Sequence, residues 1–129
     1  MAKKKKMTKA ERARAERWGV RAEGLAALWL RLGGWRVLER RYRVPAGEID
    51  LIAKRGPTLA VIEVKARAHF KDALDSIGTH KRRRVERATA AFLSTHPEWS
   101  KVSPRFDVMV LSPWRLPRHL KDAWRPDRP

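Results

Sequence analysis

Two segments that alternate polar and apolar residues, joined by a short turn, constrain the fold of this chain most. Residues 47–52 read GEIDLI, residues 61–67 read VIEVKAR, and Gly56-Pro57 lies between them. Alternation with a period of two is typical of half-buried strands, and Gly-Pro is a strong turn signal. Because strands joined so closely pair antiparallel, the pattern predicts a β-hairpin.

The hairpin register decides which polar side chains meet. If residues 55–58 form the loop, Asp50 lies directly across from Glu63, and Glu48 lies across from Lys65. All four side chains then project from one face. Like charges placed opposite each other destabilise a sheet and raise one another's pKa, so the carboxylate pair points to a ligand. Magnesium takes oxygen ligands, and one or two carboxylates suffice when waters complete its coordination.

A simpler interpretation of the same face is a solvated surface crossed by ion pairs such as Glu48–Lys65, each contributing about 0–1 kcal/mol. A hairpin loop of three or five residues would also shift the register and break the pairing of Asp50 with Glu63. The opposed Asp50 and Glu63 favour the metal site. Lys65 lies two residues beyond Glu63 on the same face, so it would hold an attacking water or stabilise charge on a phosphate. We therefore take Asp50, Glu63 and Lys65 as candidate catalytic residues, with Glu48 as a supporting residue paired with Lys65.

These residues also carry a resemblance. Asp50 followed by Glu63-Val64-Lys65 resembles the PD-(D/E)XK nuclease signature. More closely, GEIDLIA at 47–53 with EVKAR at 63–67 resembles the YraN-like family of small bacterial proteins, which is grouped with Holliday-junction-resolvase-like nucleases. The resemblance covers roughly residues 18–110. Family members often have Asn where Arg41 stands, so the match is partial there.

The resemblance implies a restriction-endonuclease-like core and a magnesium site that also accepts manganese. Asp50, Glu63 and the carbonyl of Val64 would hold the metal, and Glu23 would complete the site directly or through water. From the residues alone, Glu23 resembles an ordinary surface residue, although it has no basic partner three or four positions away. The resemblance also implies action on branched or structured DNA, and it allows a homodimer, since resolvases of this fold often act as dimers.

The charge balance points to a polyanionic partner. The 129 residues contain 31 Lys and Arg against 14 Asp and Glu, for a net charge of +17. Nucleic acid, DNA above all, is the leading candidate, and an anionic membrane surface is the weaker one. Cysteine is absent, which excludes disulfides and thiolate sites. No signal-peptide pattern and no run of about 18–20 apolar residues occurs, so we expect a cytoplasmic protein without a membrane segment.

Lys81, Arg82 and Arg83 crowd the start of the helix expected at residues 80–94. Crowded positive charge at the start of a helix opposes its dipole, so nucleic-acid binding explains it better than solubility does. A solvated basic face is the alternative. The residues expected to bind nucleic acid are Arg41, Arg43, Arg67, Lys81, Arg82 and Arg83.

The rest of the chain predicts an α/β or α+β domain. Residues 8–32 form a helix, with Trp18, Ala22, Leu25, Trp29 and Leu32 expected to face the core. A second helix covers 80–94, with Val85, Ala88, Phe92 and Leu93 inward. Strands are expected at 35–43, 105–111 and, as a short edge, 119–124. This gives a mixed sheet of four to five strands flanked by helices, in a single nuclease-like domain at 10–125, between a disordered basic tail at 1–9 and a frayed end at 126–129.

The favoured function is a metal-dependent endonuclease acting on DNA. The competing class is a DNA- or RNA-binding protein that retains the nuclease fold without cutting. A basic accessory protein associated with RNA or the ribosome is a third, weaker option, which the charge alone allows.

Overall fold

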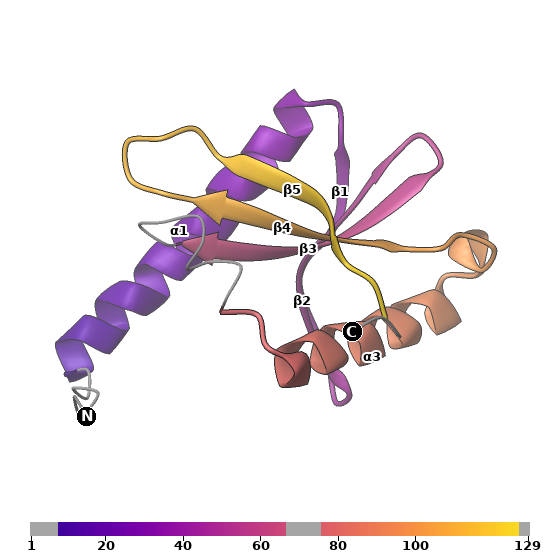
Figure 1. Ribbon diagram of the computed structural model, residues 1–129, viewed down its shortest axis with the longest axis horizontal. Coiled ribbons are helices and arrows are strands. Elements are labelled where there is room, and N and C mark those ends of the chain that lie inside the picture. Colours follow the sequence, from indigo (N-terminus) through magenta and orange to yellow (C-terminus); the bar gives the residue numbers. More distant parts are fainter. Residues whose placement is uncertain (1–7, 67–75, 127–129) are drawn as a thin grey trace.

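A mixed five-stranded sheet forms the centre of the protein in the computed structural model, which describes residues 8–66 and 76–126 (Figure 1). The strands lie side by side in chain order, β1 to β5. β3 and β4 are parallel and the other neighbours are antiparallel. The elements are α1 (Lys9–Leu32), β1 (Arg36–Val44), β2 (Gly47–Arg55), β3 (Thr58–Ala66), α3 (Thr79–Thr95), a 3-10 turn (Pro97–Trp99), β4 (Arg105–Leu111) and β5 (Arg118–Trp124). The predicted fold class is confirmed.

The two helices cover opposite faces of the sheet, and the alternation along β3 shows the division. Leu59 and Val61 pack in the cluster that contains α3, whereas Ala60 and Ile62 pack in the cluster that contains α1. All four are fully buried. Because both faces are covered, the central strands have apolar residues on both sides.

α1 packs against the sheet through small side chains. Its N-cap Thr8 accepts a hydrogen bond from the Glu11 amide at 3.0 Å, so the helix begins at Lys9, inside the expected tail. The buried face consists of Ala22, Ala26, Ala27 and Leu30. The predicted inward stripe is wrong apart from Ala22, because Trp18, Leu25, Trp29 and Leu32 are 37–75% exposed. Alanines let the helix backbone approach the sheet closely, and the larger side chains lie on the outer side.

α3 provides the crossover that the parallel pair β3–β4 requires. Val85, Ala88 and Phe92 are buried as predicted, and Leu93 packs partly buried against the same cluster. Its first turns lie unusually close to β2: a Cβ added to Gly47 would stand 1.9 Å from the Arg84 carbonyl oxygen. Only glycine fits at that position, and the close contact brings the start of α3 to the sheet edge where the predicted site lies.

The β2–β3 hairpin has the predicted register, with Lys54 paired with Leu59. The turn is tighter than expected, because Arg55 still pairs with Thr58 and only Gly56-Pro57 remains as the loop. Gly56 has φ +57°, a conformation that glycine adopts at little cost. The ladder ends at the Leu51–Ile62 pair, so Asp50 and Glu63 come immediately beyond it.

No helix in the described residues is long and apolar enough to cross a membrane.

Candidate active site

Asp50 and Glu63 lie where β2 and β3 separate, and their side chains fill the gap. The Val64 amide donates to Asp50 Oδ2 at 2.8 Å, and the Asp50 amide donates to Glu63 Oε1 at 3.4 Å. Each acid is thus fixed by the backbone of the opposite strand, and the predicted neighbouring carboxyl pair is present.

The carboxyl pair resists carrying two negative charges. Burial and the negative charge of Asp50 raise the pKa of Glu63 from 4.5 to about 8, and Lys81 only partly opposes the shift. The Glu63 side chain is 2% exposed. A divalent cation that replaces the Glu63 proton would relieve the repulsion between the two carboxyl groups.

Two lysines complete the cluster from different elements. Lys81 on α3 reaches Glu63, with Nζ 3.5 Å from Oε2, and its ammonium is close enough to Lys65 on β3 to affect the pKa of that residue. Burial, together with the nearby positive charge of Lys81, lowers the pKa of Lys65 to about 8. Although burial opposes the shift, the negative charges of Glu63 and Asp50 help to raise the pKa of Lys81.

Glu23 on α1 approaches the same cluster from the other side. Its pKa is raised by burial and by the charge of Asp50, against the effect of Arg41. Arg41 Nε stands 3.0 Å from Glu23 Oε2. The two atoms are not aligned for a hydrogen bond, so this buried oxygen lacks a hydrogen-bond partner among the described residues. An open acceptor of this kind suits a water or a ligand of a metal site.

The predicted Glu48–Lys65 ion pair is wrong. The Glu48 carboxylate lies 3.6 Å from Arg43 Nε on β1, its neighbour in the β1–β2 ladder. The reason is that the β2–β3 ladder stops at Leu51, before Glu48 could face Lys65. Glu48 instead lines a small cavity of about 170 Å³ with Lys81 and Arg84.

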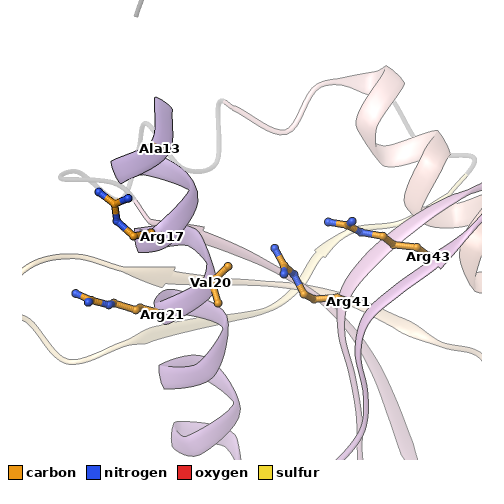
Figure 2. A pocket seen from close by; sticks show the side chains of 6 residues that line it. All are labelled: Ala13, Arg17, Val20, Arg21, Arg41 and Arg43. Atoms are coloured by element: carbon orange, nitrogen blue, oxygen red, sulfur yellow. The ribbon is translucent and has the colours of Figure 1, made fainter. Parts of the chain in front are cut away.

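Some of the residues predicted to bind nucleic acid lie around the site, and others make contacts elsewhere. Arg41 and Arg43 line an open cavity of about 720 Å³ with Arg17 and Arg21 from α1 (Figure 2). Sequence reasoning missed the two α1 arginines, although a spacing of four residues puts both on one helix face. Because Arg41 also contacts Glu23, this arginine cavity adjoins the carboxyl cluster.

The other predicted nucleic-acid contacts differ in their surroundings. Arg83 is exposed, and Arg82 lies over the Trp124 ring at 5.6 Å from its centroid. Lys81 faces the carboxyl pair. Arg67 falls outside the described residues.

The donor set fits a hydrated divalent cation held by two acids. Within residues 8–66 and 76–126 there is no group of three His, Cys, Asp or Glu arranged to hold a metal ion. Asp50 and Glu63 are hard oxygen donors in contact, and magnesium often uses one or two carboxylates with several waters. Manganese accepts the same ligands. Glu23 Oε2, which is ion-paired with Arg41 but accepts no hydrogen bond from the described residues, would add a third acceptor within the cluster's electrostatic reach.

Comparisons with known proteins agree with this architecture. A family model described as uncharacterised protein family UPF0102 matches residues 22–111, a range that includes Glu23, Asp50, Glu63 and Lys65. A UPF0102 protein of Paramagnetospirillum magneticum is 50% identical over 117 residues, covering 88% of this chain and 91% of that protein. A UPF0102 protein of Parvibaculum lavamentivorans is 52% identical over 112 residues, covering 87% and 84% respectively.

Among solved structures, Hjc of Archaeoglobus fulgidus, a Holliday junction resolvase, superimposes with a TM-score of 0.52. The match covers 78% of this chain and 73% of the resolvase at 19% sequence identity. At that identity the likeness supports the fold alone.

Proposed function

The chain belongs to the uncharacterised protein family UPF0102, the YraN-like family that its motifs indicate, and from this premise we propose that it is a metal-dependent endonuclease acting on DNA. The substrate class is duplex DNA with branches or other structural departures. The observation that carries this proposal is the Asp50–Glu63 carboxyl pair, held by backbone amides beside two lysines.

The carboxyl pair would hold the cation, with Glu23 acting through water and Val64 contributing its carbonyl. When bound, the cation supplies Lewis acidity at the scissile phosphate and a water of lowered pKa. Magnesium is the proposed ion and manganese a substitute.

The lysines have separate roles in the proposed reaction. Lys65 follows Glu63 by two residues, and its amine would orient the attacking water or contact a phosphate oxygen. Lys81 contacts the Glu63 carboxyl group while no cation is bound. With a cation on Glu63, the Lys81 ammonium would be free to contact the phosphate group.

The arginine cavity would hold the DNA backbone beside the carboxyl cluster. Guanidinium groups bind phosphates without reading base sequence, so this surface fixes the position of a strand and leaves selectivity to DNA shape. Arg41 links the cavity to Glu23, which brings a bound phosphate next to the proposed metal site.

A non-catalytic nucleic-acid-binding protein is the second candidate. One observation favours it: the Lys81 ammonium already lies beside Glu63, where the proposed cation would bind, as in a fold that has exchanged its cation for a lysine. Such a protein would bind DNA or RNA through the same arginines and leave it intact.

One cleavage experiment separates the two candidates. Labelled duplex, single-stranded and four-way-junction DNA are incubated with the full chain in magnesium, in manganese or in chelator. The endonuclease cuts at least one substrate, only in the presence of a divalent cation. Salt-dependent binding in all three conditions without any cut identifies the binding protein.

A further inference from the structure

A second basic cavity lies where α1 ends. Its volume is about 310 Å³, and Trp29, Gly33, Trp35, Arg55, His119 and Lys121 line it, with no acid among the lining residues. Gly33 is ten residues beyond Glu23, which corresponds to roughly 15 Å along the helix axis. This Trp35 cavity is therefore separate from the carboxyl cluster.

Arg55 is held in a fixed orientation in this cavity. Its Nη1 donates to the Gly33 carbonyl at 3.2 Å, and its guanidinium lies over the Trp35 ring at 4.6 Å from the centroid. Trp35 is 5% exposed, so it forms a rigid base for the arginine. A guanidinium already oriented loses little freedom when it binds an oxyanion.

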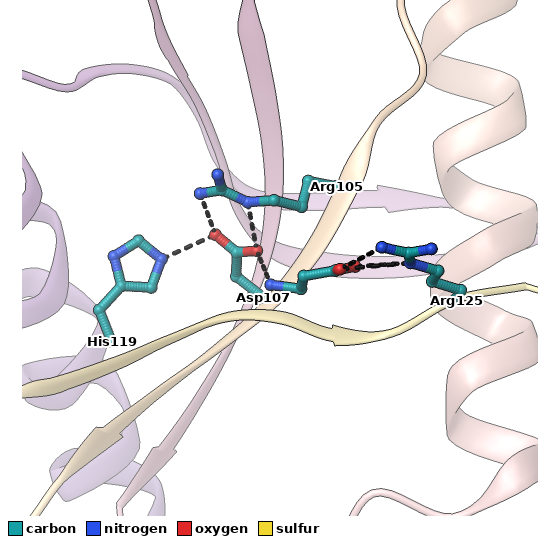
Figure 3. Close-up of polar contacts among 5 residues, drawn as sticks. Arg105, Asp107, His119 and Arg125 are labelled. Atoms are coloured by element: carbon teal, nitrogen blue, oxygen red, sulfur yellow. Dashed lines mark hydrogen bonds and ion pairs between the residues drawn. The ribbon is translucent and has the colours of Figure 1, made fainter.

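His119 is also held, by a buried acid behind it. Its Nε2 lies 2.7 Å from Asp107 Oδ2, and Asp107 receives two further bonds from Arg105 (Figure 3). Although burial opposes ionisation, the hydrogen bonds from His119 and Arg105 lower the Asp107 pKa. The ionised acid fixes the imidazole with its other ring nitrogen pointing away from Asp107.

The charge of the cavity remains positive after its neighbours are considered. Arg105 compensates Asp107, and the Asp122 carboxylate is bound to Arg125 at 2.8 Å. Lys121 makes no hydrogen bond or ion pair with the described residues. Arg55 and Lys121 therefore face the cavity without a carboxylate in its lining, which favours the binding of an anion.

We propose that the Trp35 cavity binds a phosphate group through Arg55, His119 and Lys121. Two sources share this chemistry, a DNA strand that continues past the carboxyl cluster and a free nucleotide. Trp29 is 37% exposed at the cavity wall, so it can stack with the base next to the bound phosphate. Only the first source, a DNA strand that continues past the carboxyl cluster, depends on the proposed function.

The first test compares two double variants of the full chain in chelator, where no cleavage interferes. Arg55→Gln/Lys121→Gln removes the cavity charges. Lys54→Gln/Lys101→Gln removes the same charge outside the cavity, and Lys54 lies over Trp99. Fluorescence anisotropy with labelled 30-base-pair DNA is measured across a salt series. The cavity variant should bind about tenfold more weakly than the control, with a log–log salt slope lower by up to about 0.9 per lost contact.

The second test identifies the source of the phosphate. The ring signals of His119, assigned with His119→Gln, are followed by NMR with inorganic phosphate, thymidine monophosphate or an eight-residue oligothymidylate. A shift with the mononucleotide that disappears in Lys121→Gln supports a nucleotide site, and a shift with the oligonucleotide alone supports a strand site. Lys121→Gln breaks no contact between described residues, so it keeps the fold.

The outcomes separate the two proposals. Unmoved His119 signals, together with equal DNA binding by the cavity and control variants, overturn the phosphate site. If the wild type cuts no DNA but the His119 signals shift and the cavity variant binds DNA more weakly than the control, only the proposed nuclease function is overturned.

Discussion

Lys81 Nζ lies 3.5 Å from Glu63 Oε2, on the acid that the proposed cation would also contact. An ammonium and a divalent cation cannot both neutralise the same buried carboxylate without repelling each other. The metal-free protein therefore contains its own competitor for the site, supplied by α3.

Replacing Lys81 with methionine should strengthen metal binding. Lys81→Met keeps the length of the side chain and removes its charge, so we expect the dissociation constant for manganese to fall by about tenfold. Isothermal titration calorimetry at constant pH measures it, with Arg83→Met as a control of equal charge change on the same helix. Equal affinities of the two variants would show that Lys81 does not compete with the metal.

The raised pKa of Glu63 should make stability depend on pH. Folding favours the protonated acid, so its contribution is complete below about 4.5 and is lost as pH rises through about 8. The lowered pKa of Lys65 acts in the window from about 8 to 10.5, so measurements between pH 5 and 7.5 avoid it. Comparison with Glu63→Gln then separates Glu63 from Glu23, whose pKa is also raised.

Over that range, metal-free wild type should lose stability relative to Glu63→Gln, by on the order of 1 kcal/mol per pH unit. Urea unfolding measures the free energy at each pH. Glu98→Gln, at an exposed position, is the control and should follow the wild type. Parallel curves for Glu63→Gln and wild type would contradict the coupled carboxyl pair.

Gly47 should not tolerate a side chain. A Cβ there meets the Arg84 carbonyl at 1.9 Å, so Gly47→Ala must push α3 away from β2 at a cost of roughly 1–3 kcal/mol or more. Gly19→Ala, with open space around it, should instead be neutral or stabilising by up to about 1 kcal/mol. Thermal unfolding of the two variants compares them. An undamaged Gly47→Ala protein would refute the close α3 contact.

The arginines on α1 should contribute to DNA affinity. Arg17→Gln/Arg21→Gln removes two guanidinium groups from the arginine cavity beside Glu23. We expect weaker binding and a salt slope reduced by up to about 0.9 for each lost phosphate contact. The matched variant Arg12→Gln/Arg14→Gln loses the same charge five to seven residues earlier on α1. If both variants keep the wild-type slope, this cavity is not a DNA contact.

The sequence predicted the features that depend on neighbouring residues. The β2–β3 register assumed from alternation and a Gly-Pro turn is the observed one, although the loop is two residues shorter than expected, and it brings Asp50 and Glu63 together. Strand β4 begins and ends at the predicted residues. Local patterns are sufficient for such features because the turn and the alternation together fix which residues pair across the strands and on which face of the sheet each side chain lies.

Other features depend on contacts between distant elements, and the sequence did not predict them. The spacing of the large residues of α1 predicted a core face, yet the face packed against the sheet consists of Ala22, Ala26, Ala27 and Leu30. Lys81 looked like one of several basic residues on a helix, and only the crossover through α3 brings it to Glu63. The Glu48–Lys65 pair failed because the strands separate before it could form.

The most direct test of the account is single-turnover cleavage of a four-way junction in magnesium by wild type and by Asp50→Ala, prepared identically. Asp50 holds Glu63 and the Val64 amide together. If the Asp50–Glu63 pair is the active site, wild type cuts and Asp50→Ala does not. The variant should bind the junction at least as tightly, because a negative charge has left a surface that faces phosphates. If both proteins cut at the same rate, the activity does not come from this site, and the assignment of the active site to Asp50 and Glu63 is wrong.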